Sequence, residues 1–193
     1  MTKTARHKLP YWAVFSVFFL IFVTLLIVSI ISEHKMKLAT HPLKYTEYVE
    51  HYAEENSLDK YLIYSVIKTE SGFQSTAVSN VGAKGLMQMM EPAFDWTKWR
   101  MGDDSDTSYE DIFDPETNIK YGTYMLHLLV EELGGVNEAL AAYHAGLSKV
   151  QGWLADPQYS DDGKTLKTIP TPDTNHYVSK VNKAYETYID LYK

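Results

Sequence analysis

The sequence contains no cysteine, which excludes disulfide bonds, thiolate nucleophiles and cysteine-ligated metals. Positive charge is also scarce over most of the chain. Three of the 18 basic residues, Lys3, Arg6 and Lys8, lie near the start, which leaves 15 basic and 25 acidic residues beyond residue 32, a net charge of −10. Nucleic-acid binding depends on neutralising phosphates, so this balance excludes a nucleic-acid partner. Binding to an anionic cell wall would have to come from a shaped cleft.

An uncharged run over residues 11–31 is dominated by Phe, Leu, Ile and Val. About 20 apolar residues cross the hydrocarbon core of a bilayer as a helix. Tyr11 and Trp12 stand where an interfacial aromatic belt would lie. The run exceeds the roughly 7–15 apolar residues of a cleaved signal peptide, and no small-x-small cleavage motif follows it. We therefore expect a retained transmembrane helix.

Basic residues flank both ends of this run, but a short basic N-terminus ahead of a first helix usually stays in the cytoplasm. The predicted organisation is a cytoplasmic N-terminus over residues 1–10, an anchor over 11–31, a tether over 32–43 and a domain over 44–193. A single pass then places that domain on the extracellular, cell-wall side of the cell membrane.

Helical periodicity dominates the segment after the tether. The pattern predicts a mostly α domain with long loops, whose helices cover residues 45–56, 58–70, 92–99, 118–133, 138–144, 150–154 and 176–192. Residues 72–84 are rich in Ser, Asn and Gly and are expected to form an irregular connection between helices. Asp161-Asp162-Gly163 is a turn signal that closes either a small β-hairpin or an ordered loop.

A carboxylate, Glu70, stands on the apolar face of the helix expected over 58–70. Val66 and Ile67 lie four and three positions before it, on the same face. A carboxylate on a core-facing stripe must be paired, neutralised or functional, and desolvation raises its pKa towards that of a general acid. The alternative is a solvent-exposed side chain at a frayed helix end, because Ser71-Gly72 follows at once.

Two further clusters carry polar groups among small residues. In Gly82-Ala83-Lys84-Gly85-Leu86-Met87-Gln88, the glycines permit close backbone approach, and the glutamine can both donate and accept hydrogen bonds. The apolar members of this cluster are expected to pack mostly in the core. In residues 141–146, Tyr143 and His144 supply polar tips beside small residues.

The acidic loop over residues 102–111 invites comparison with a calcium-binding loop. The EF-hand pattern requires glycine at its sixth position and glutamate at its twelfth. Counted from Asp104, these positions hold Tyr109 and Pro115. We therefore expect a solvated loop, and the sequence predicts neither a metal site nor a cofactor.

The chemistry-bearing segments follow one another in a fixed order: Glu70-Ser71-Gly72-Phe73, residues 82–88, Phe113-Asp114-Pro115 with Asn118-Ile119 and Gly122, Ala142-Tyr143-His144-Ala145-Gly146, and Ile169-Pro170 ahead of Thr174 and Tyr177-Val178. No single element is specific, but the ordered set resembles the transglycosylase SLT domain, the glycoside hydrolase group that also contains goose-type lysozymes. The resemblance covers roughly residues 44–193. It implies a lysozyme-like α-helical fold with a long sugar-binding groove.

The resemblance also implies roles for individual residues. Glu70 corresponds to the family's catalytic acid, and Tyr177 to a tyrosine that points towards it. The supporting or sugar-binding positions are Ser71, Met87, Gln88, Tyr143 and His144. At His144 the family usually has an asparagine that holds a substrate acetamido group, so a titratable imidazole there would make activity more pH-dependent or change substrate preference. Asp173, where the family often has glutamate, is a milder departure.

The implied activity is that of a lytic murein transglycosylase, which cleaves the β-1,4 bond between N-acetylmuramic acid and N-acetylglucosamine in peptidoglycan and leaves 1,6-anhydro ends. Glu70 would act as acid and then as base, since no second carboxylate has motif support. Hydrolysis by a muramidase with the same Glu70 stays open, as does a catalytically weak peptidoglycan-binding module that serves a secretion or conjugation machine. The expected partners are glycan strands and the membrane.

Overall fold

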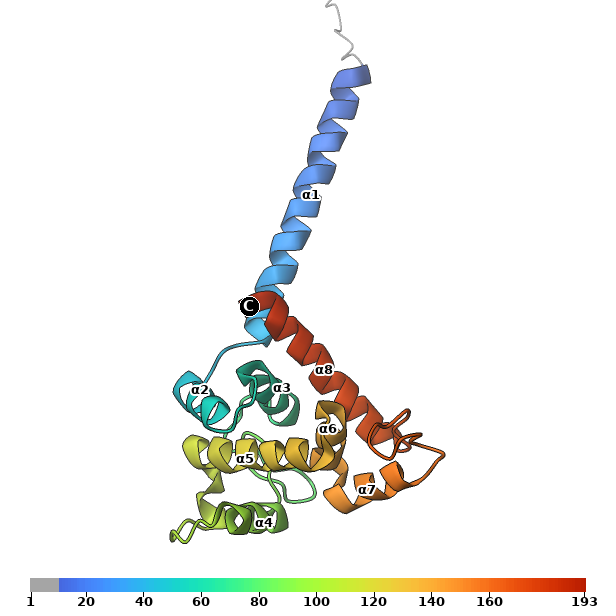
Figure 1. The fold of residues 1–193 in the computed structure, drawn as a ribbon. Helices are drawn as coiled ribbons and strands as arrows, with labels where there is room; N and C mark the ends of the chain where they lie inside the picture. The colour runs from blue at the N-terminus through green and yellow to red at the C-terminus, as the bar shows by residue number, and fades with distance from the viewer. Residues whose placement is uncertain (1–10) are drawn as a thin grey trace, which may run out of the picture. The chain divides into compact units, whose positions relative to one another are not determined.

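The computed structural model describes residues 11–193, which fall into two compact units that meet between residues 42 and 43. The first unit is formed by a single helix, α1 (Tyr11–Thr40), of 30 residues (Figure 1). By length and composition this helix is able to cross a membrane. The predicted cytoplasmic segment, residues 1–10, lies outside the described residues.

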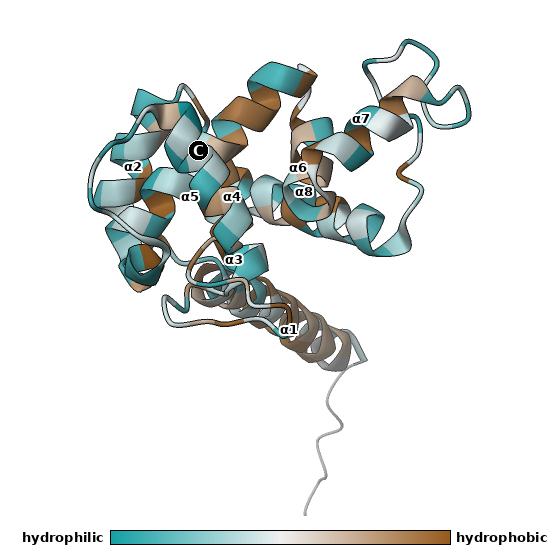
Figure 2. Cartoon of the chain, turned by 90° about the horizontal axis from the view of Figure 1, so that it is seen from below, coloured by the Kyte–Doolittle hydropathy of each residue, from teal (hydrophilic) through white to brown (hydrophobic). Residues whose placement is uncertain are grey.

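Figure 2 shows α1 mostly in brown, and the large side chains exposed between Phe15 and Ile31 are apolar. A helix of this kind requires apolar surroundings on every face. The helix does not end at residue 31 but continues to Thr40, through most of the segment predicted to be a tether. The Glu33 carboxylate and the Lys37 ammonium, one turn apart, form an ion pair of 3.2 Å that supports this extension.

The second unit, residues 43–193, is built from helices joined by loops, and no β-strand occurs within residues 11–193. The prediction of a mostly α domain is therefore confirmed. The elements are α2 (Thr46–Glu55), α3 (Lys60–Glu70), α4 (Glu91–Met101), the 3₁₀ helix η1 (Tyr109–Phe113), α5 (Pro115–Leu133), α6 (Val136–Ala145), α7 (Leu147–Ala155) and α8 (Pro172–Tyr192).

Helix α5 packs against α2, α4 and α6, while α3 packs along α8 (Figure 1). The main core lies between these helices and includes Ile63, Ile67, Leu86 and Ile119, all with 0% exposure. A smaller cluster around Phe94 lies between α4, η1 and α5. Helix α6 also packs against α8.

Helix starts follow local side-chain chemistry. Helices α5 and α8 begin at Pro115 and Pro172, earlier than periodicity predicted, because proline has no N–H and suits the first turn of a helix. The Asp114 carboxylate caps α5 by accepting the Thr117 N–H at 2.9 Å. Apolar periodicity misses these starts since the first turn is polar.

The turn at Asp161-Asp162-Gly163 closes an ordered loop, so the hairpin alternative is wrong. A single isolated bridge joins Ser160 to Leu166. The Asp162 carboxylate accepts the N–H groups of Lys164 and Thr165, at 2.8 and 2.7 Å. These side-chain bonds occupy backbone donors that would otherwise extend a strand ladder.

Candidate active site

Glu70, the last residue of α3, is a partly buried carboxylate at the end of an apolar helix face. Val66 and Ile67, one turn before it, have 0% exposure. The spacing directs the Glu70 side chain towards the same interior face. Side chains from α6 and α8 surround it there.

The pKa of Glu70 is raised from its ordinary value to about 7. Burial is the main cause, because it disfavours the charged form. A hydrogen-bonding influence of the Tyr177 hydroxyl and the positive charge of Lys180 oppose this effect. Glu70 therefore holds a proton in a substantial fraction of molecules at neutral pH, and its pKa suits both proton donation and proton removal.

Ser71 fastens the end of α3 to the loop that follows it. Its buried hydroxyl lies 2.7 Å from the carbonyl oxygen of Leu86 and 3.2 Å from that of Ile67, and it accepts the Phe73 N–H at 3.1 Å. These contacts fix the backbone on both sides of Glu70. Ser71 thus acts through the position of its neighbours.

The loop over residues 82–90 places Gln88 beside the same end of α3. Gln88 and Gly85 both have positive φ, at 49° and 80°. The Gln88 side-chain amide donates to the carbonyl oxygens of Gly85 and Ala77, at 2.9 and 3.2 Å, so its nitrogen holds the loop together. The Met87 side chain is fully buried, and its sulfur accepts a weak hydrogen bond from the Thr123 hydroxyl at 3.9 Å, while its main chain bonds to Asn118 and Tyr143.

Asn118, on α5, holds this loop through its side chain. No role was predicted for this residue from the sequence. Its side chain has 0% exposure, accepts the Met87 N–H at 2.7 Å, and donates to the carbonyl oxygens of Ile112 and Lys84, at 2.9 and 3.2 Å. A Cβ at Gly85 would lie 2.0 Å from the Asn118 amide nitrogen, so only glycine fits there. The sequence signal for this role was a polar residue, Asn118, next to Ile119 on a buried helix face.

Two tyrosines border the carboxylate of Glu70. The Tyr143 hydroxyl, from α6, donates to the Met87 carbonyl oxygen at 2.8 Å. Burial, together with the nearby Glu70 charge, raises the pKa values of Tyr143 and Tyr177 well above their ordinary value, so both stay neutral. Within residues 11–193 the Tyr177 hydroxyl has no hydrogen bond of ordinary length and angle, although it lies near enough to Glu70 to lower the pKa of that carboxyl.

His144, on α6, lies against the ring of Tyr177. The two rings stack with centroids 4.6 Å apart and an angle of 29° between their planes. Nδ1 of His144 is 3.2 Å from the hydroxyl oxygen of Thr174. The structure therefore brings together Glu70, Ser71, Gln88, Tyr143, His144 and Tyr177 from α3, the 82–90 loop, α6 and α8.

The acidic loop after α4 is tied to α5 through Asp103, whereas Asp104 and Asp106 are exposed to solvent as expected. The Asp103 carboxylate accepts hydrogen bonds from the Tyr121 hydroxyl at 2.6 Å and the Lys120 ammonium at 3.1 Å. Hydrogen bonding to Ser105 and Tyr121 lowers the pKa of Asp103. Within the described part of the chain, no three His, Asp or Glu side chains are grouped so as to hold a metal ion.

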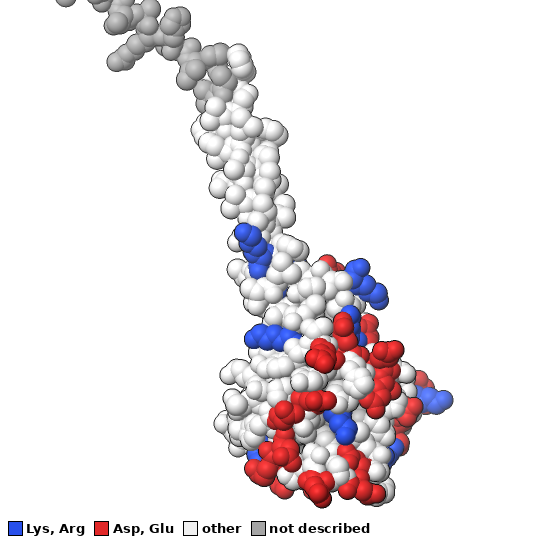
Figure 3. Space-filling model, turned by 90° about the vertical axis from the view of Figure 1, so that its left-hand side faces the viewer, with Lys and Arg blue, Asp and Glu red and all other residues white. Residues whose placement is uncertain are grey.

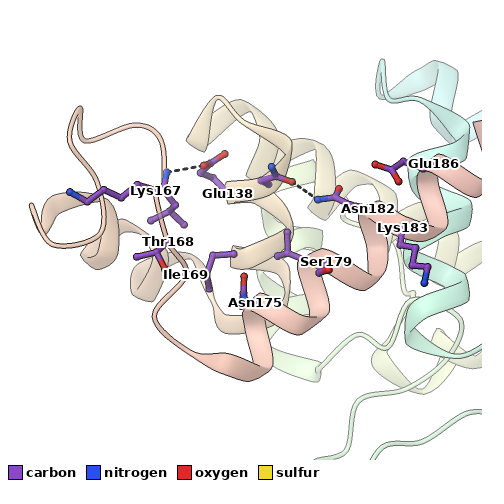
Figure 4. Close-up of a pocket in the computed structure, with 12 residues that line it drawn as sticks. Glu138, Lys167, Thr168, Ile169, Asn175, Ser179, Asn182, Lys183 and Glu186 are labelled. Carbon is purple, nitrogen blue, oxygen red and sulfur yellow. Dashed lines mark hydrogen bonds between the residues drawn. The ribbon is translucent and has the colours of Figure 1, made fainter.

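The largest cavity described lies away from Glu70. It has a volume of about 580 Å³ and is lined by α6, α8 and residues 166–169 (Figure 4). Asn175, Ser179, Asn182 and Glu186 line it from α8, and at about 100° per residue these positions face away from Tyr177. The cavity is therefore separate from the carboxylate site.

Comparison with known proteins identifies a family and several relatives of this chain. The family model described as "Transglycosylase SLT domain" matches residues 47–166. The chain is 31% identical to membrane-bound lytic murein transglycosylase C of Serratia proteamaculans over 75% of this chain and 46% of that protein. It is 30% identical to the soluble lytic murein transglycosylase of Escherichia coli K12 over 76% of this chain and 23% of that protein.

A solved structure gives the same result. The 70 kDa soluble lytic transglycosylase of Escherichia coli superposes with a TM-score of 0.69 and 26% identity, over 79% of this chain and 25% of that one. The chain thus spans less than half the length of the curated relatives it matches. The shared part corresponds to the helical unit that contains Glu70.

Proposed function

The chain belongs to the transglycosylase SLT family, and from that premise we propose that it is a lytic murein transglycosylase. Its substrate is the β-1,4 bond between N-acetylmuramic acid and N-acetylglucosamine in peptidoglycan. One observation carries the proposal: a single carboxylate, Glu70, with a pKa raised to about 7, lies beside two neutral tyrosines. Such a group can give and then take a proton at neutral pH.

In the first step, protonated Glu70 donates its proton to the glycosidic oxygen while the bond from C1 of the muramic acid residue breaks. The leaving sugar keeps this proton on O4. The acetamido group of the muramic acid residue stabilises the positive charge that develops at C1. This substrate assistance takes the place of the second carboxylate that most glycosidases use.

In the second step, Glu70 acts as a base. Its carboxylate removes the proton from the C6 hydroxyl of the same sugar, and O6 forms a bond to C1. A 1,6-anhydro ring results, Glu70 regains its proton, and no water is consumed. We propose that the neutral hydroxyl of Tyr177 stabilises the transient carboxylate between the two steps.

The charge on the surface of the helical unit agrees with substrate recognition by a cleft. Figure 3 shows many acidic side chains spread over one face of this unit, which gives no general attraction to an anionic wall. Binding of glycan strands therefore depends on contacts near Glu70, from Gln88, Tyr143 and His144. We propose Met87 and Ser71 as the residues that hold these groups in place.

The products decide between transfer and hydrolysis. We expect the full-length chain in detergent to release 1,6-anhydro-muropeptides from purified peptidoglycan, measured by mass spectrometry. Reducing ends in their place would show that water replaces the C6 hydroxyl and that the chain is a muramidase. Wall binding without any release would show a binding module.

The orientation of the chain in the membrane can be tested separately. We propose that α1 crosses the cell membrane once, with residues 1–10 in the cytoplasm and residues 43–193 on the wall side. Because the chain has no cysteine, single-cysteine variants report orientation without background. We expect a membrane-impermeant maleimide to label Ser148→Cys in intact cells, since Ser148 is exposed, and to label Thr4→Cys only after lysis. The reverse pattern would contradict this topology.

A further inference from the structure

The position of the Tyr177 hydroxyl beside Glu70 is not explained by a hydrogen bond. That hydroxyl is buried and, among the described residues, has no partner of ordinary length and angle. A ring that was free to move would turn its hydroxyl towards a partner, because an unpaired buried donor is unfavourable. Ring packing must therefore hold Tyr177 where it is.

His144 supplies that packing on one face of the Tyr177 ring. The centroid separation of 4.6 Å and the interplanar angle of 29° describe an offset stack between neighbouring aromatic rings. The His144 residue is exposed at the surface although its Nδ1 is partly buried, so burial alone does not fix the ring. Something else must hold the imidazole against the tyrosine.

A pair of threonines at the start of α8 holds the imidazole. The Thr171 hydroxyl donates to the Thr174 oxygen at 2.9 Å, and the Thr174 oxygen is 3.2 Å from Nδ1 of His144. The Thr174 hydroxyl therefore joins Thr171 to Nδ1 of the imidazole, and this chain of contacts fixes the orientation of the His144 ring.

We propose that His144 is a positioning residue: its stacked ring, held by Thr174, keeps the Tyr177 hydroxyl against the Glu70 carboxyl and so sets the protonation of the catalytic acid. The inference deepens the proposed function and depends on it for its kinetic consequence. The asparagine usual in the family has no ring to stack, so this device belongs to the histidine of this chain.

The charged groups that face His144 act in both directions. Burial lowers the pKa of His144, the carboxylate of Asp173 on α8 raises it, and the ammonium of Lys149 on α7 lowers it. On balance the pKa of His144 lies below its ordinary value. The positioning role depends on the stacked ring and needs no charge on it.

The direction of the effect follows from the role of Tyr177. Its hydroxyl favours the charged form of Glu70 and lowers the pKa of that carboxyl. If the hydroxyl drifts away, the pKa of Glu70 must rise above about 7. Loss of the stack and loss of the hydroxyl should therefore change the pKa of Glu70 in the same direction.

The test compares three variants of the full-length chain in detergent. His144→Phe keeps an aromatic ring to stack on Tyr177, His144→Ala removes the ring, and Tyr177→Phe removes the hydroxyl. The pKa of Glu70 is measured by carbon-13 NMR of its carboxyl group, identified by its loss in Glu70→Gln. We expect His144→Ala and Tyr177→Phe to raise this pKa by about 0.5 or more, and His144→Phe, which keeps a ring but loses the contact with Thr174, to raise it by less than half as much.

Kinetics supply the second readout. With peptidoglycan as substrate, we expect His144→Ala to lower kcat about tenfold and to move the alkaline limb of its pH profile upwards, while His144→Phe moves this limb by less than half as much. An unchanged Glu70 pKa in His144→Ala, or an equal rise in His144→Phe, would overturn the inference. The NMR titration does not require turnover. If the pKa changes occur as expected but the chain shows no activity, the proposed function is rejected and the positioning role of His144 is retained.

Discussion

Replacement of Glu70 by glutamine is expected to abolish glycan cleavage and to leave the fold and the binding of glycan intact. Glutamine matches the shape of the protonated carboxyl, so the packing at the end of α3 should not change. It has no proton to give at neutral pH and cannot accept one from the C6 hydroxyl. Because one residue serves as both acid and base, the rate should fall by about 10³-fold or more.

Glu91→Gln is the matched control for this substitution. Glu91 is exposed in the first turn of α4, near the site in sequence, and makes no contact that the reaction requires. Initial rates of muropeptide release should stay within about twofold of the parent in this variant. Retention of more than a tenth of the activity by Glu70→Gln would show that another group transfers the proton, and the mechanism would be wrong.

Much of the helical architecture could be predicted because apolar periodicity is a local property. The amphipathic pattern of α3 located Glu70, since a carboxylate stood on a stripe that had to be buried. The extension of α1 to Thr40 was not predicted, because charged residues in its last turns conceal a helix that is stabilised by the Glu33–Lys37 pair.

The composition of the site was less accessible to sequence reasoning. Only the family resemblance linked Tyr177 with Glu70, because pattern rules do not relate residues so far apart in the chain. The stack of His144 on Tyr177 depends on how closely α6 and α8 approach one another, and periodicity gives no information on that distance. The three hydrogen bonds of Asn118 join three segments and have no local signature.

Those hydrogen bonds make Asn118 the position where a small substitution should cost most stability. Asn118→Ala leaves the Met87 N–H and the carbonyl oxygen of Ile112 without these partners inside the core, while the carbonyl oxygen of Lys84 keeps only the Met89 N–H. At about 1–3 kcal/mol for each buried group left unpaired, the free energy of unfolding should fall by about 3–5 kcal/mol. This is a large share of the stability of an ordinary domain.

Urea denaturation of the full-length chain, followed by tryptophan fluorescence, measures the loss. Asn175→Ala is the matched control, because Asn175 is exposed on α8 and its removal should change the free energy of unfolding by less than about 0.5 kcal/mol. Even in the folded fraction of Asn118→Ala, the loop that carries Gln88 loses its support, so activity per folded molecule should also fall. A change in stability below about 1 kcal/mol would mean that the loop is held by Ser71 and by the internal bonds of Gln88, and that Asn118 only fills space between α5 and the loop.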